Sequence, residues 1–186
     1  MSSYIVLLRG VNVGGKSKVS MAELKNHIEK LECSRVRTYI NSGNTLLESA
    51  VDRERLSKQI EEILTVKYKL ESAAGRVLIL SARELEVILK AKPKQFGEKP
   101  DMYHSDLIFL MNGLKVSDAM AVFDPRERVD SIWPGDKVIY SQRLSAERTK
   151  SRLNKIMGTA AYKSMTIRTW NTASKLLELS HESKEV

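Results

Sequence analysis

The sequence contains few of the residues that build disulfide, metal or membrane structures. It has one cysteine, Cys33, so no disulfide can form within the chain. Its three histidines, His27, His104 and His181, are scattered and lack the close spacing of a zinc site. No apolar run approaches the ~20 residues of a membrane-spanning helix, and the N-terminus lacks the features of a secretory signal. These absences predict a cytoplasmic protein without a resident metal or a membrane segment.

The composition predicts a folded, basic protein. The chain has 186 residues, 42% of them hydrophobic, and 31 Lys+Arg against 23 Asp+Glu leave a net charge of +8. This length suits one domain or two small ones. Between residues 143 and 168, seven cations are offset by Glu147 alone; they are Arg143, Arg148, Lys150, Arg152, Lys155, Lys163 and Arg168. Such an excess indicates either a solvated surface or an anionic partner.

Both halves of the chain have the same predicted order of strands and helices. In the first half, strands are expected at 4–8, 36–40, 45–48 and 77–80, with helices after Ser20, Asp52 and Ser81. In the second half, strands are expected at 107–111, 129–133, 138–140 and 166–169, with helices from Ser117 and Ser145 and a last helix over Ala173. We therefore expect an α+β fold of two ferredoxin-like (βαββαβ) units packed together, each followed by a helix. One larger mixed sheet is the alternative.

The expected boundaries follow composition. Residues 1–92 form the first unit and residues 106–186 the second. The polar stretch 93–105 contains Pro93, Gly97 and Pro100, which are typical of a linker. The turn Asn41–Asn44 joins two strand-like runs and predicts a β-hairpin.

Residues 10–17, Gly-Val-Asn-Val-Gly-Gly-Lys-Ser, match the P-loop pattern G-x-x-x-x-G-K-[ST] directly after a strand. Three features count against a working P-loop. The capping box that predicts the start of the helix is at Ser20, whereas the helix of a P-loop would begin at Lys16. The later strands end in Ser81 and Asn112, which leaves the magnesium-binding aspartate missing. The predicted hairpin also implies antiparallel pairing. A Gly-rich basic loop still predicts an anion site formed by backbone N–H groups.

Three motifs in order resemble one family. They are Leu7–Gly15 (Leu-Leu-Arg-Gly-Val-Asn-Val-Gly-Gly), Arg37–Asn44 (Arg-Thr-Tyr-Ile-Asn-Ser-Gly-Asn) and Thr166–Thr172 (Thr-Ile-Arg-Thr-Trp-Asn-Thr). Together they resemble the bacterial family known as domain of unknown function 1697, over nearly the whole chain. The resemblance implies a cytosolic protein of two ferredoxin-like α+β units, and it carries over no catalytic residue, cofactor or substrate. Asn41 and Thr169 depart from the family pattern, which more often shows glutamine and asparagine there.

Nine residues in three loops are the candidate ligand-binding residues. They are Arg9, Asn12, Gly14, Gly15 and Lys16 in the glycine-rich loop, Ser42 and Asn44 in the hairpin, and Arg168 and Asn171 near the last helix. A structural role is the alternative for each: the asparagines and the serine are common turn and cap residues, and the arginines can be solvated. No carboxylate pair or Ser-His-Asp arrangement indicates catalysis. Cys33 follows a helix end, where the dipole opposes a thiolate. Catalytic residues and cofactor stay unassigned.

The leading hypothesis is a cytosolic binding protein whose loops at 9–18, 41–44 and 166–172 converge on an anionic site. Its ligand would be a phosphate-bearing small molecule or a nucleic acid. The helix from Ser145 is expected to carry Arg148, Arg152 and Lys155 on one face, where they are solvated or contact phosphates. Two alternatives are a small phosphotransferase or hydrolase that uses the Gly10–Ser17 loop, and a protein–protein interaction module. The sequence assigns no oligomeric state.

Overall fold

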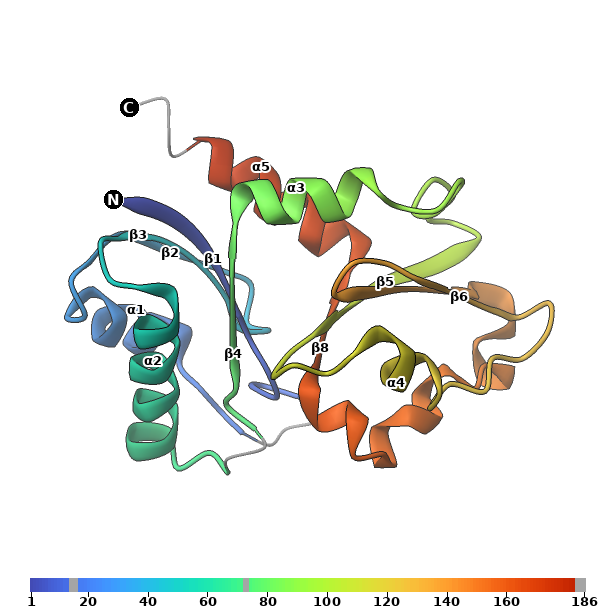
Figure 1. Cartoon of the computed structure of the whole chain (residues 1–186), viewed down its shortest axis with the longest axis horizontal. Coiled ribbons are helices and arrows are strands. Elements are labelled where there is room, and N and C mark those ends of the chain that lie inside the picture. The colour runs from blue at the N-terminus through green and yellow to red at the C-terminus, as the bar shows by residue number, and fades with distance from the viewer. Residues whose placement is uncertain (14–16, 72–73, 183–186) are drawn as a thin grey trace. The chain divides into compact units, whose positions relative to one another are not determined.

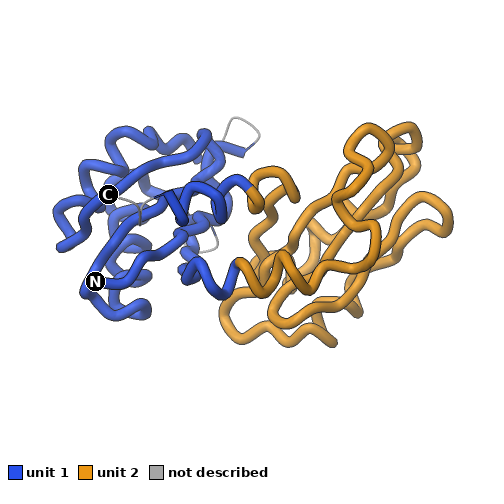
Figure 2. The backbone as a smooth tube through the Cα atoms, turned by 90° about the horizontal axis from the view of Figure 1, so that it is seen from above, with its two compact units in different colours: residues 1–85, 175–186 blue, residues 86–174 orange. Residues whose placement is uncertain are grey.

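The computed structural model describes residues 1–13, 17–71 and 74–182, which form a mixed α+β fold with two four-stranded antiparallel sheets (Figure 1). The predicted α+β class is therefore confirmed. The contacts divide the chain into two compact units, coloured blue and orange in Figure 2. Unit 1 comprises residues 1–85 and 175–186, and unit 2 comprises residues 86–174. Within the described residues, we find no helix with both the length and the apolar character needed to cross a membrane.

Unit 1 contains the first sheet and two helices. The elements are β1 (Ser2–Leu8), α1 (Met21–Glu29), β2 (Cys33–Tyr39), β3 (Asn44–Ser49), α2 (Arg53–Tyr68) and β4 (Val77–Ser81), and the strand order is β2-β3-β1-β4. The predicted hairpin is the antiparallel pair β2–β3. Apolar residues at helical spacing bury one face of each helix, such as Leu24 in α1 and Leu56, Ile60 and Leu64 in α2, all without exposed surface. Each such side chain contributes about 1.5–3 kcal/mol to stability.

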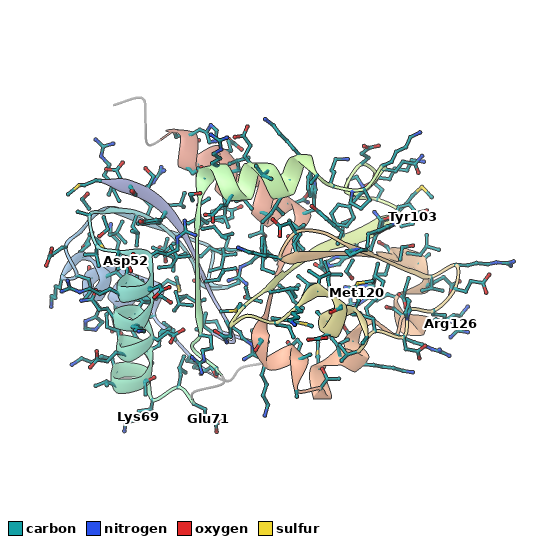
Figure 3. The ribbon with its side chains drawn as sticks, in the orientation of Figure 1. Asp52, Lys69, Glu71, Tyr103, Met120 and Arg126 are labelled. Atoms are coloured by element: carbon teal, nitrogen blue, oxygen red, sulfur yellow. The ribbon has the colours of Figure 1, made fainter. Side chains whose placement is uncertain are left out.

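The helix ends of unit 1 follow local sequence signals. Asp52 accepts hydrogen bonds from the first turn of α2, and Lys69 ends that helix in a left-handed conformation. Figure 3 labels these two residues at the two ends of α2. The capping box before α3 (Ala82–Lys90) also forms, since the Ser81 Oγ accepts from the Glu84 N–H and the Glu84 Oε2 accepts from the Ser81 N–H. Arg53 binds the same carboxylate through two 2.8 Å hydrogen bonds. Partial burial raises the pKa of Glu84, but the hydrogen bonds from Arg53 and Ser81 outweigh this and lower it to about 2.

Unit 2 contains the second sheet. Its elements are β5 (Tyr103–Leu110), α4 (Val116–Met120), β6 (Asp130–Pro134), β7 (Val138–Leu144), β8 (Met165–Thr169) and the start of α5 (Trp170–Glu182). The strand order is β6-β7-β5-β8, which repeats the order of the first sheet.

The expected helix from Ser145 is wrong. Three 3₁₀ helices occupy this segment, η1 (Ser145–Lys150), η2 (Leu153–Gly158) and η3 (Ala161–Ser164). The backbone becomes extended at Ser151, and the N–H of Arg152 donates to the Asp130 carboxylate at 2.8 Å instead of continuing a helix. Arg148, Arg152 and Lys155 therefore share no α-helical face, and the last two both contact Asp124, at 3.0 and 3.3 Å.

The stretch 93–105 contributes to the core of unit 2. Phe96 is fully buried and meets the rings of Trp133, Tyr140 and Trp170 edge-on, at centroid distances of 5.3–6.2 Å. The Tyr140 hydroxyl donates to the carbonyl of Ile88 at 2.7 Å. The contact-based division at residues 85/86 and 174/175 thus differs from the expected boundaries at 92 and 105, which were placed on polar composition.

Candidate functional site

The glycine-rich loop and the hairpin turn are joined by Asn12. Its side-chain amide donates to the carbonyls of Val19 (2.9 Å) and Asn41 (2.7 Å), and its Oδ1 accepts from the Val19 N–H (2.8 Å). The N–H of Leu8 also donates to the Gly43 carbonyl at 2.8 Å. Two of the three expected loops, 9–18 and 41–44, therefore do meet. Both hydrogens of the Asn12 amide are engaged, so this side chain braces the loops.

The polar residues of the hairpin turn serve the turn itself. Asn44 is fully buried, and its amide donates to the Tyr39 carbonyl and to the Ser42 Oγ, both at 3.1 Å. Gly43 has a φ of +79°, and a Cβ there would lie 2.4 Å from the Val11 side chain. This position therefore requires glycine. The contacts of Ser42 and Asn44 agree with their structural alternative as turn residues.

The other candidates of the glycine-rich loop are Arg9, which is half-buried, and Gly14, Gly15 and Lys16. The backbone of Arg9 is fixed by hydrogen bonds with Arg76 (2.8 Å) and Gly75 (2.9 Å), and its side chain is half-buried. Gly14, Gly15 and Lys16 lie outside the described residues. The helix α1 begins only at Met21, after the Ser20 cap, and the sheet is antiparallel. The described part of this loop thus lacks the strand–loop–helix geometry of a P-loop. An open depression of about 560 Å³ beside it is lined by residues that include Lys18 and Asn41.

Arg168 is enclosed in unit 2. Only 7% of its surface is exposed, and its guanidinium donates to the Thr166 Oγ1 (3.0 Å) and the Ile167 carbonyl (2.7 Å). Burial lowers the pKa of Arg168 to about 10, which still leaves it charged at neutral pH. The solvated alternative for this residue is wrong, because the side chain folds back along β8.

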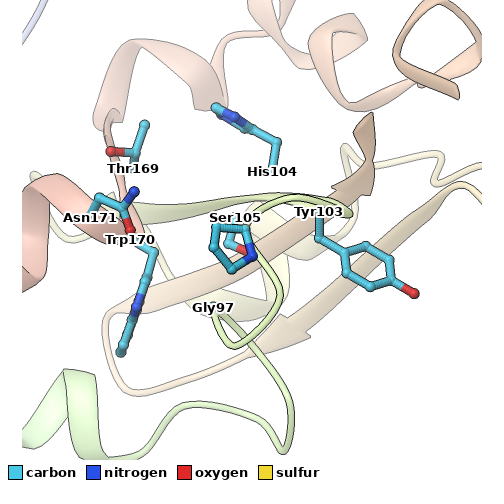
Figure 4. A pocket seen from close by; sticks show the side chains of 8 residues that line it. Gly97, Tyr103, His104, Ser105, Thr169, Trp170 and Asn171 are labelled. Atoms are coloured by element: carbon cyan, nitrogen blue, oxygen red, sulfur yellow. The ribbon is translucent and has the colours of Figure 1, made fainter. Parts of the chain in front are cut away.

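A pocket of about 140 Å³ lies where β8 passes into α5 (Figure 4). Its lining includes Gly97, His104, Ser105, Thr169, Trp170 and Asn171. Of the candidate residues that the structure describes, only Asn171 lines it. In Figure 4 the Tyr103 ring points away from Trp170 and Asn171.

The start of α5 is fixed by Thr169. Its Oγ1 accepts from the Thr172 N–H at 3.2 Å and lies 2.9 Å from the Thr172 hydroxyl. Thr169 is thus the N-terminal cap, the role that is the structural alternative for Asn171. Asparagine and threonine both serve in this position, so the departure from the family pattern at Thr169 keeps the cap. Asn171 is exposed in the first turn.

Gly97 and Trp170 form one wall of the pocket. Gly97 has a φ of +75°, and a Cβ there would lie 2.7 Å from the indole of Trp170. The Nζ of Lys92 lies 5.9 Å from the centre of the same ring, which is typical of a cation–π contact. The indole is therefore held in place by its neighbours.

His104, which lines the pocket, is paired with an aspartate on the same strand, β5. The Nε2 of His104 lies 3.0 Å from the Asp106 Oδ1, and the Nη1 of Arg143 lies 3.5 Å from the other carboxylate oxygen. On the opposite side of the strand, Ser105 accepts a hydrogen bond from Gln142 at 3.0 Å. His104 falls in the stretch 93–105, for which the sequence predicts a linker; its His-x-Asp spacing is that of two residues on one face of a strand and could have indicated the pair. Among the described residues, no cluster of ligating side chains could hold a metal.

Comparisons with known proteins identify relatives without a named activity. The model of the family described as protein of unknown function (DUF1697) matches residues 1–140. The conserved bacterial protein SP0830 from Streptococcus pneumoniae has a similar structure, with a TM-score of 0.81 and 28% sequence identity over 96% of this chain and 98% of that chain. A search of curated proteins finds no match.

Proposed function

The chain belongs to the family of proteins of unknown function DUF1697, a description that names no activity, and we therefore propose a function from the geometry. We propose that unit 2 binds the phosphate group of a small ligand in the pocket at the N-terminus of α5. This proposal retains the anionic ligand expected from the sequence and narrows the site to the last of the three loops.

The observation that carries the proposal is the helix start in the pocket wall. The first backbone N–H groups of any α-helix have no partner within the helix, and the helix dipole adds a partial positive charge there. Thr169, Trp170 and Asn171 belong to this end of α5, which is 13 residues long. A helix start that opens into a pocket is suited to bind an oxyanion.

The size of the pocket supports a phosphate group and argues against a whole nucleotide. Its volume of about 140 Å³ corresponds to roughly four or five water molecules at about 30 Å³ each. Pockets for drug-sized ligands are larger, at about 300–1,000 Å³. The rest of an organic phosphate would therefore extend into solvent, and Asn171, which lines the pocket in the first turn of α5, supplies a polar side chain at the helix start.

Calorimetric titration at low salt tests this function. Inorganic phosphate and phenyl phosphate are the probes, and preference for one of them distinguishes free phosphate from a phosphate monoester. We expect saturable binding that weakens about tenfold in Asn171→Ala, which removes one hydrogen bond to a charged group from an exposed position. Lys18→Ala is the matched control in unit 1 and leaves the affinity unchanged. No binding of either probe, or loss in the Lys18 variant alone, would refute the proposal.

We also propose that both units are ferredoxin-like. The support is the order β-α-β-β-α-β in unit 1 and the shared strand order 2-3-1-4 of both sheets. In unit 2, the 3₁₀ helices η1, η2 and η3 stand where the second helix of that motif belongs. A cytoplasmic location is part of the same proposal.

A further inference from the structure

We propose that Asn112 deamidates without an enzyme, so that the turn between β5 and α4 is a site of covalent modification. The proposal goes beyond the phosphate site and needs no ligand. Asn112 is followed by Gly113, and none of the other asparagines in the sequence precedes a glycine. Asparagine is one of the chemically labile residues of proteins, and the residue that follows it provides the attacking nitrogen.

The reaction joins two neighbouring groups of the chain. The backbone nitrogen of Gly113 loses its proton to hydroxide and attacks Cγ, the side-chain carbonyl carbon of Asn112. The Cγ–Nδ2 bond breaks, ammonia leaves, and a cyclic succinimide remains. Water then opens the ring at either of its carbonyl carbons, which gives aspartate or an isoaspartate whose backbone runs through Cβ and Cγ. In both products an NH of the chain has been exchanged for an O, and a carboxylate replaces the neutral amide.

The turn leaves the reacting groups accessible. Asn112 and Gly113 are exposed, with φ of +53° and +72°, and a Cβ on Gly113 would meet no atom within 4 Å. Among the described residues, neither the Asn112 side chain nor the Gly113 N–H has a hydrogen-bond partner. The attack requires rotation about ψ of Asn112, which opens the turn. The turn is closed by the hydrogen bond from the Leu114 N–H to the Met111 carbonyl (3.0 Å), and exposed backbone of this kind opens at a low free-energy cost.

The other asparagines lack this combination of features. Asn44, for example, is fully buried. Asn171 is the closest match to Asn112, because it is also exposed and also lies where a strand passes into a helix. Its successor Thr172, however, is β-branched, and the Thr172 N–H donates to the Thr169 Oγ1 at 3.2 Å. The attacking nitrogen at this position is therefore both crowded and engaged.

The two products differ in their effect on the turn. Aspartate tolerates the left-handed conformation, as asparagine does. Isoaspartate lengthens the backbone before Gly113 and disrupts the hydrogen bond between Leu114 and Met111. The modification thus places a slow, irreversible change at the end of β5, the strand that pairs with both β7 and β8.

Mass spectrometry of trypsin digests tests the proposal after incubation of the folded protein at mildly alkaline pH. The tryptic peptide that ends at Lys115 contains Asn112 as its one asparagine, and the peptide Thr169–Lys175 contains Asn171 as its one asparagine. We expect conversion at Asn112 to be at least about tenfold faster, which corresponds to a barrier lower by about 1.4 kcal/mol. The rate should rise with pH, since the attacking nitrogen must lose a proton. Gly113→Ala should bring the rate down towards that of Asn171, and Asn112→Asp provides the chromatographic standard that distinguishes aspartate from isoaspartate.

The same digests of protein kept in concentrated urea separate the effect of the fold from that of the dipeptide. Unfolding should accelerate conversion at Asn171 more than at Asn112, because only Thr172 has an N–H that unfolding releases. Equal rates at the two asparagines in the folded protein, or an unchanged rate in Gly113→Ala, would overturn the proposal. A rate at Asn112 more than about a hundredfold lower in the folded than in the unfolded chain would also overturn it, since the turn would then protect the site.

Discussion

Replacing Asn12 with alanine removes the amide that ties the glycine-rich loop to the hairpin turn. Three hydrogen bonds of 2.7–2.9 Å are lost, each with a net value of about 1 kcal/mol, and the free energy of unfolding is expected to fall by about 3 kcal/mol. Asn12 also has a φ of +54°, which disfavours alanine by a further ~1 kcal/mol. Asn12→Gly loses the same bonds without this strain, so it should be the milder variant.

Urea denaturation followed by far-UV circular dichroism measures the loss of unfolding free energy in Asn12→Ala and Asn12→Gly as a shift of the transition midpoint at constant slope. The two tryptophans, Trp133 and Trp170, both lie in unit 2, so their fluorescence follows the unfolding of that unit. If the midpoint of the fluorescence transition stays unchanged, the loss of stability belongs to unit 1. A loss below about 1 kcal/mol in Asn12→Ala would refute the bracing role. A larger loss in the glycine variant than in the alanine variant would refute the argument from φ.

Three further predictions concern stability. The depressed pKa of Glu84 contributes stability that is present above its unfolded pKa of about 4.3 and is lost as pH falls through about 2, so Glu84→Gln should flatten the acid limb of a pH–melting curve by about 1 kcal/mol, allowing for its exposure. Gly97→Ala should lower the free energy of unfolding by about 1–3 kcal/mol more than Gly113→Ala. The two glycines have similar φ, but a Cβ at Gly97 meets the Trp170 side chain whereas a Cβ at Gly113 meets nothing within 4 Å. Tyr140→Phe should lower the free energy of unfolding by about 1–2 kcal/mol in urea denaturation, since a buried carbonyl loses its donor.

Features that depend on neighbouring residues could be predicted from the sequence. The caps at Ser20 and Asp52 and the box at Ser81 involve partners two or three residues away, and all three form. The hairpin over 41–44 follows from residues that tolerate positive φ. Alternating and helical apolar spacing likewise predicted the strands and helices of unit 1.

Features that depend on residues distant in the sequence could not be predicted from the sequence. The segment after Ser145 has helical spacing, but Asp130, 22 residues before Arg152, takes the N–H that a helix would need. Gly97 stands in a stretch with the composition of a linker, and its contact with Trp170 crosses 73 positions. The pocket therefore arises from tertiary packing, and of its lining only Asn171 was among the candidate residues.

The most direct test of the account is a phosphate titration of ¹⁵N-labelled protein followed by NMR. The phosphate site predicts saturable shifts of the backbone amides of Trp170 and Asn171, and of the His104 ring signals, with the amides of Asn12 and Asn41 unchanged. Saturable shifts confined to the loops around Asn12 and Asn41, or no saturable shift at the start of α5, would contradict it.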